Sequence, residues 1–217
     1  MTHTMADPFG VADLRARILD SWAASPARFR EDANAEDDYA LGGYRNRVVV
    51  ELAQNAADAA QRAGRRGRLV LRLRGREFTA ANTGAPLTAE GVESLSTLRA
   101  SAKRDAAAVG RFGVGFTAVA SLSDDVVFAS RDGAVRWNRD RAAALVHDEL
   151  IATGRAHPKL AEELARRDNR VPLLRLPFAD RTRPPDGFDS AVILQLRDAD
   201  AGARLALQLA ETGQALL

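Results

Sequence analysis

One stretch constrains the fold of this chain more than any other: residues 48–60, with the sequence VVVELAQNAADAA. Apolar residues recur along it at three- and four-residue steps, the spacing of an amphipathic helix whose apolar face packs on a core. These residues are Val48, Leu52, Ala56, Ala59 and Ala60. We therefore predict a central helix here, ending near Gly64, around which the rest of the chain is arranged.

The same stretch carries a second, polar face. Glu51, Asn55 and Asp58 are spaced four and three residues apart, so their side chains are neighbours one helical turn apart. A solvated helix face would explain such a triplet. However, Asn favours caps and turns over helix interiors because its side chain competes for backbone hydrogen bonds. A mid-helix Asn between two acids therefore indicates a chemical role.

Composition narrows the class of protein. The 217 residues are 46% hydrophobic and 28% charged, which are ordinary values for one large globular domain. The 31 basic and 29 acidic side chains leave a formal charge of +2, which gives little support for a nucleic-acid partner.

Several kinds of site and location are disfavoured by the sequence. The chain has no cysteine, which removes disulfides, thiol chemistry and cysteine-bound metals, and its three histidines lack metal-ligand spacing. No apolar run approaches the ~18 residues of a membrane span, and the N-terminus lacks the features of a signal peptide. We expect a cytoplasmic protein without a membrane partner.

The remaining elements are predicted from periodicity and turn residues. The acidic run 31–38 is expected to be a solvated loop, and the small, polar residues 96–109 a mobile segment. Strands mixed with long helices favour an α+β two-layer sandwich, in which helices cover one face of a mixed, mostly antiparallel sheet. Further helices are predicted at 11–24, 88–95, 116–122, 139–152, 158–167 and 202–217, and strands at 69–73, 77–81, 126–130, 134–137, 173–176 and 191–196.

Two glycine-bearing segments follow the central helix. Residues 110–115 (GRFGVG) precede a predicted helix, where glycines allow close approach to a phosphate and the helix N-terminus supplies free N–H groups. Residues 82–84 (NTG) end a predicted strand, and the amide of Asn82 offers a donor and an acceptor that match the Watson–Crick edge of adenine. Taken singly, a tight packing turn explains the first of these segments about equally well, and an Asx-type turn explains the second one better.

In combination and order, these segments resemble the GHKL ATPase superfamily of gyrase, heat shock protein 90, histidine kinases and MutL. Residues 51–59 resemble its N-box helix, 82–88 its first glycine box and 110–116 its second, in the form found in heat shock protein 90. Two shorter matches, 101–103 and 190–194, resemble the lid-lysine segment and the last strand of those chaperones. The resemblance covers residues 44–137 and 188–197.

The resemblance implies a Bergerat fold with a mobile ATP lid, and a role for each matching residue. Glu51 would be the general base that deprotonates the attacking water. Asn55 would bind Mg²⁺ through its side-chain oxygen. Asp58 would line the pocket near the sugar and adenine, or hold the helix in register. The other residues implied to contact ATP or ADP are Asn82, Gly84, Leu87, Lys103, Arg111, Phe112, Gly113, Val114, Gly115, Phe116 and Ser190.

Two departures from the family pattern bear on the adenine site and the lid. Asn82 stands where the superfamily usually has Asp, and it can still accept from the adenine amino group. Pro86 stands where a second glycine is common; it fixes φ and removes an N–H at the start of the lid. The NTGxP variant resembles sacsin-type, heat-shock-protein-90-like ATPases more than the chaperone itself.

The resemblance thus predicts one nucleotide-binding domain over 1–217. Its parts are an N-terminal tail and helix (1–43), the N-box and glycine boxes (44–137) with a lid at 96–111, and the closing helices and strands (138–217). We expect Mg-ATP binding and slow hydrolysis in a chaperone-type cycle, helped by a downstream domain, a protein client or a homodimer partner. Alternatives are a non-hydrolysing nucleotide sensor and a DNA-linked ATPase of the gyrase or MutL type, the latter supported by the Arg-rich turn 65–68 alone.

Overall fold

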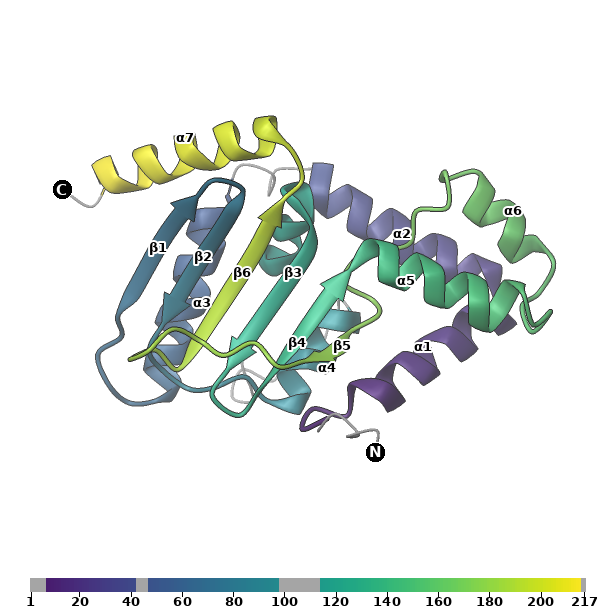
Figure 1. Cartoon of the computed structure of the whole chain (residues 1–217), viewed down its shortest axis with the longest axis horizontal. Coiled ribbons are helices and arrows are strands. Elements are labelled where there is room, and N and C mark those ends of the chain that lie inside the picture. The colour runs from purple at the N-terminus through teal and green to yellow at the C-terminus, as the bar shows by residue number, and fades with distance from the viewer. Residues whose placement is uncertain (1–6, 42–46, 98–113, 216–217) are drawn as a thin grey trace, which may run out of the picture.

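The computed structural model describes residues 7–41, 47–97 and 114–215, which form a six-stranded antiparallel sheet with helices packed around it (Figure 1). The strand order is β1-β2-β6-β3-β4-β5, so the last strand of the sequence lies at the centre, between β2 and β3. The strands are β1 (Leu69–Arg74), β2 (Glu77–Asn82), β3 (Ser123–Ser130), β4 (Gly133–Asn138), β5 (Phe178–Asp180) and β6 (Ser190–Leu196).

Helices lie on one face of the sheet and beyond its β5 edge. In Figure 1, α3 and α4 lie behind the strands, while α1, α2, α5 and α6 gather beside β4 and β5. The described helices are α1 (Val11–Ala24), α2 (Pro26–Leu41), α3 (Val48–Arg62), α4 (Ala89–Thr97), the 3₁₀-helix η1 (Val114–Ser121), α5 (Arg139–Val146), the π-helical turn η2 (His147–Ile151), α6 (Lys159–Ala165) and α7 (Ala199–Ala215). The α+β class and the antiparallel sheet agree with the sequence prediction.

The main core lies between the sheet and α3. Along β2 and β6 every second side chain points to this side, because successive residues of a strand face opposite ways. Phe78 of β2, Leu194 of β6 and Leu52 of α3 are all buried there. The apolar face of α3 therefore packs on this side of the sheet.

Elements with strong local signals are confirmed. The central helix ends at Arg62, and Gly64 follows with a φ of 63°, the left-handed conformation typical after a helix C-terminus. Both predicted hairpins form: β1 pairs with β2 and β3 with β4, each antiparallel. Thr88 caps α4 as expected, since its Oγ1 accepts from the N–H of Gly91 at 3.1 Å.

The prediction of a solvated loop at 31–38 is wrong, because these residues belong to α2. Phe29, Asp32 and Glu36 recur at helical spacing, and all three are buried. Two acids that appeared solvated in the sequence face the interior, where the carboxylate of Asp32 accepts from Trp22 Nε1 at 2.9 Å and lies 3.0 Å from Arg175 Nη2.

The prediction of a strand at 173–176 is also wrong. The backbone N–H groups of Leu173 and Leu174 donate to the carboxylate of Glu36 at 2.7 and 2.9 Å, in place of a neighbouring strand. The short strand β5 begins two residues later, at Phe178. The apolar run reflects burial of an irregular segment, which periodicity cannot distinguish from a short strand.

A second hydrophobic cluster accounts for the region 138–187, where the family resemblance is silent. It joins α1, α2, α5 and α6 beside the sheet. Trp22 and Phe29 are fully buried in it, with their rings edge to face at a centroid distance of 5.1 Å. This cluster extends the structure beyond the expected two layers.

Other element boundaries shift by a few residues. The helix predicted at 116–122 is the 3₁₀-helix η1, and the one predicted at 139–152 continues from α5 into the π-helical turn η2. Helix α4 extends to Thr97, so the first two residues of the predicted lid belong to a helix; Ser96 is buried there and accepts from Trp137 Nε1. The rest of the predicted mobile segment, from residue 98, lies outside the described residues. Within the described ranges, no helix is long and apolar enough to cross a membrane.

The buried position of Glu36 predicts a large effect of its removal. Glu36→Ala should lower the free energy of unfolding by about 3 kcal/mol or more, because two backbone N–H groups lose their acceptor and Arg139 loses one of its two carboxylate partners. The neighbouring Asp37→Ala serves as the control: Asp37 pairs with Arg167 at the surface, and its loss should cost less than about 1 kcal/mol. Urea denaturation of both variants would test this. Equal losses would contradict it.

Candidate functional site

A narrow pocket lies between α3 and one end of the central strands. Helix α3 contributes Leu52, Asn55 and Ala59, and the sheet side contributes Leu69, Ala80, Asn82, Ala85, Phe128, Ser190 and Val192. The enclosed space is about 20 Å³, little more than one water needs. The pocket is therefore small, and its walls are mostly apolar with three polar side chains among them.

The strand register brings two of these polar side chains together. Asn82 ends β2 and Ser190 begins β6, and the two residues are direct partners in the antiparallel ladder. Ser190 is 2% exposed, and its Oγ is buried without a hydrogen-bond partner in the described part of the chain. Since buried hydroxyls are nearly always paired, this oxygen is suited to a water or a ligand group.

The first glycine segment is pressed against the backbone of α3. The N–H of Ala85 donates to Ala59 O at 2.8 Å, and a Cβ added to Gly84 would lie 2.6 Å from the carbonyl carbon of Ala59. Gly84 also has a φ of 151°, which other residues rarely adopt. Only glycine fits between this turn and the helix.

The second glycine segment reaches the acidic end of the same helix. A Cβ added to Gly115, in the first turn of η1, would lie 1.8 Å from Oε2 of Glu51. The Glu51 side chain is 14% exposed, and its carboxylate lies 3.9 Å from Nε of Arg47. The fold therefore brings the carboxylate of Glu51 against the backbone at Gly115.

Some predicted site residues lie away from the pocket. Leu87 and Phe116 belong to the main core, where Phe116 stacks on Phe128 at a centroid distance of 6.0 Å. Asp58 is half-buried on α3 but does not line the pocket. Val114 begins η1. The predicted residues Lys103, Arg111, Phe112 and Gly113 lie outside the described ranges.

Asp189 is a rim residue that the sequence analysis missed. Its carboxylate accepts from Arg65 Nη2 at 2.5 Å, from Arg131 Nη1 at 3.2 Å and from the N–H of Gly84 at 2.9 Å. It thereby ties the α3–β1 connection and the β3–β4 turn to the first glycine segment. The sequence carries a weak signal, an acid directly before the predicted last strand, but its partners are more than 50 residues away.

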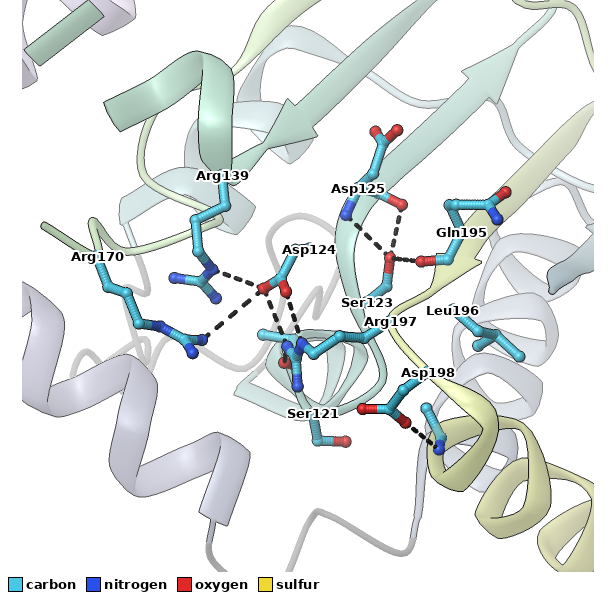
Figure 2. Close-up of polar contacts among 12 residues, drawn as sticks. Ser121, Ser123, Asp124, Asp125, Arg139, Arg170, Gln195, Leu196, Arg197 and Asp198 are labelled. Carbon is cyan, nitrogen blue, oxygen red and sulfur yellow. Dashed lines mark hydrogen bonds and ion pairs between the residues drawn. The ribbon is translucent and has the colours of Figure 1, made fainter. Parts of the chain in front are cut away.

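A second polar cluster surrounds Asp124, near the opposite end of β6 (Figure 2). Its carboxylate accepts from Arg139 Nε at 2.7 Å and from Arg197 Nε at 2.5 Å, and Arg170 Nη2 lies 3.8 Å away. Burial acts to raise the pKa of Asp124, but hydrogen bonds from Arg197 and Arg139 outweigh it and lower the pKa from 3.8 to about 2.

Metal binding by protein side chains alone finds no support in the described residues, which contain no group of three or more His, Cys, Asp or Glu that could hold an ion.

Neither protein-family models nor curated proteins match this chain. The candidate site is accordingly defined by its own residues: Glu51 and Asn55 on α3, Asn82 and Ser190 at the ends of the strands, and Gly115 facing Glu51.

The close packing at Gly84 predicts a large cost for any side chain there. Gly84→Ala should lower the free energy of unfolding by about 3 kcal/mol, because the added Cβ meets the backbone of Ala59. Gly75→Ala is the matched control: Gly75 also has a positive φ, 56°, but nothing lies within 4 Å of an added Cβ, so about 1–2 kcal/mol is expected. Thermal or urea unfolding would measure both. Equal effects would show that the close contact with α3 is unimportant.

The lowered pKa of Asp124 predicts an acid-sensitive contribution to stability. Because the folded pKa of about 2 lies below the ordinary 3.8, the carboxylate stabilises the fold above about pH 4, and this contribution is lost as the pH falls toward 2. The difference in free energy of unfolding between wild type and Asp124→Asn should therefore shrink from pH 4 to pH 2. The exposed Asp132, replaced by Asn, provides the control. A difference that is constant down to pH 2 would contradict the assignment.

Proposed function

We propose that this chain is an adenine-nucleotide-binding domain of the Bergerat-fold, GHKL type, which binds Mg-ATP and hydrolyses it slowly to ADP and phosphate. The observation that carries the proposal is the meeting of Asn55, Asn82 and Ser190 in one pocket against α3. Ser190 lies more than 100 positions after the other two residues in the sequence, yet the family resemblance assigns all three to nucleotide contacts.

The pocket chemistry supports an adenine base. The base presents a donor and an acceptor side by side on its Watson–Crick edge, and the amide of Asn82 carries both complementary groups. The Oγ of Ser190, which is buried and has no hydrogen-bond partner among the described residues, provides one further polar contact beside it. The apolar walls, Leu52 and Val192 among them, suit a flat aromatic ring.

Binding requires the pocket to widen, because the space between α3 and the strands is too small for a purine. Asn55 stands on α3 and Asn82 on β2, so a separation of these two elements would widen the space between them. In this proposal the nucleotide enters by parting α3 from the strand ends, and some of its binding free energy is used for that opening.

Glu51 is the general base in this proposal. Its largely buried carboxylate would orient a water toward the γ-phosphate and accept the proton as the new P–O bond forms and the bond to ADP breaks. Asn55, one turn along, would hold Mg²⁺ through its side-chain oxygen. The ion suits a site in which phosphate oxygens and waters supply most ligands, and such a site needs no cluster of carboxylates.

The lid and the partners complete the proposal. Lys103 would neutralise phosphate charge when a lid that begins after α4 closes, and the backbone N–H groups of 111–116 would surround the phosphates. A downstream domain, a protein client or a second copy of the chain would couple closure to a heat-shock-protein-90-like or sacsin-like cycle.

The contacts of the Arg-rich turn give no support to a DNA-linked ATPase. Arg65 pairs with Asp189, and Arg68 donates to Gly187 O at 3.0 Å and lies over the ring of Phe188. These contacts give the turn a structural role beside the pocket.

Nucleotide binding is tested by thermal melting with Mg-ATP, Mg-ADP and Mg-GTP. At about 100 times its dissociation constant, an adenine nucleotide should stabilise the fold by about 2.7 kcal/mol and raise Tm by roughly 5–10 °C. Ser190→Ala should leave the free protein as stable or more stable, since the unpaired hydroxyl is removed, and should weaken nucleotide binding several-fold. Asn82→Ala should reduce the shift further.

Thr79→Ala is the matched control, because Thr79 lies on β2 but on the face away from α3, and its nucleotide shift should equal that of wild type. Glu51→Ala separates hydrolysis from binding: ATP turnover should be lost while the Tm shift remains. Unchanged turnover in Glu51→Ala would reject Glu51 as the general base. A Tm shift without turnover in the wild-type chain would leave the non-hydrolysing sensor as the better interpretation. Absence of any shift with all three nucleotides would reject the proposal as a whole.

A further inference from the structure

A larger cavity, of about 520 Å³, lies on the other side of η1, near the end of β6 opposite the candidate nucleotide pocket. Its walls come from α2, the last residues of η1, the turn after α6, and the junction of β6 with α7. The volume is within the ~300–1,000 Å³ typical of small-molecule sites. Five arginines line it: Arg139, Arg167, Arg170, Arg197 and Arg204.

Four carboxylates line the same cavity, so its formal charge does not by itself select an anion. Three of them, however, already have donors. Glu36 accepts from two backbone N–H groups and Arg139; Asp37 pairs with Arg167; and Asp198 caps α7 by accepting from the N–H of Ala201 at 2.7 Å. The fourth, Asp168, is exposed to solvent.

Donors, in contrast, remain in excess. Nε of Arg204 is buried and has no hydrogen-bond partner in the described part of the chain, and its Nη2 makes a long contact of 3.4 Å to Ser121 O. Arg170 is 55% exposed and makes only a long ion pair, of 3.8 Å, with the carboxylate of Asp124 (Figure 2). A buried N–H without an acceptor is costly, so an acceptor that enters here is favoured.

We propose that this cavity binds a phosphate-bearing small anion of the diphosphate class, with Arg170 and Arg204 as its principal ligands. Guanidinium groups form paired N–H···O bonds to phosphate oxygens, which makes arginine well suited to this recognition. Two linked phosphates match a cavity larger than one phosphate requires. The proposal is independent of the proposed nucleotide site.

Pyrophosphate is the probe, titrated calorimetrically into the intact chain without Mg²⁺ at an ionic strength fixed with sodium chloride. Wild type should bind it, and Arg170→Gln and Arg204→Gln should each weaken the affinity tenfold or more, as loss of a charge-assisted hydrogen bond predicts. Arg74→Gln removes the same charge from an exposed position on β1 and should leave the affinity unchanged. Thermal melting of each variant without ligand checks that it is folded. If Arg204→Gln is unfolded, Arg170→Gln is the variant that decides the test, because Arg170 is exposed.

The outcomes separate this site from the pocket beside α3. Absence of pyrophosphate binding, or an equal loss in Arg74→Gln, would overturn the proposal. A loss in Asn55→Ala but not in Arg170→Gln would also overturn it, because the anion would then occupy the other pocket. A titration with ADP identifies the source of the diphosphate. If Arg170→Gln weakens the binding of ADP, the cavity is assigned to nucleoside diphosphates. If Arg170→Gln weakens the binding of pyrophosphate but not that of ADP, the cavity is assigned to the free diphosphate.

Discussion

The pairing of β6 with both β2 and β3 is the interaction on which the candidate site depends. β6 comes from residues 190–196, more than 100 positions after β2, yet it lies at the centre of the sheet and places Ser190 beside Asn82. Without it, the sheet would divide into the β3–β4–β5 group and the β1–β2 hairpin, and a lone two-stranded hairpin is marginally stable in water. The pocket therefore cannot form until most of the chain is available, and such long-range pairing is expected to make folding slow.

The sequence predicts well those elements whose signals are local. Helix α3 shows a full apolar face at helical spacing, and the hairpins are marked by Gly75 and Gly133 at their turns. The glycine segments are evident in the sequence because the close approach of their backbone to α3 admits few residues other than glycine, as at Gly84 and Gly115. The sequence could not give the width of the pocket or the partners of its side chains, because both depend on distant segments.

The two wrong predictions, a loop at 31–38 and a strand at 173–176, share one cause, which is the burial of charged side chains. Asp32, Glu36 and Arg175 lie in the interior, although charged residues are normally exposed and their positions therefore resemble solvated ones in a sequence. Their partners are up to 143 positions away, as in the Asp32–Arg175 pair. Periodicity that counts only apolar residues misses α2 for this reason. The network also explains how an irregular segment at Leu173 and Leu174 is held without a strand partner.

The 3₁₀-helix η1 connects the contact with Glu51 at one of its ends to the contacts with Arg197 and Arg204 at the other. Gly115, in its first turn, lies against Glu51, and the carbonyls of Ala120 and Ser121 at its other end are held by Arg197 and Arg204. A 3₁₀-helix rises ~2.0 Å per residue and an α-helix ~1.5 Å, so rewinding its eight residues would shorten it by about 4 Å. Because both ends of η1 contact other elements, its length is fixed by those contacts. A change in the winding of η1 at one end must therefore displace the contacts at the other end.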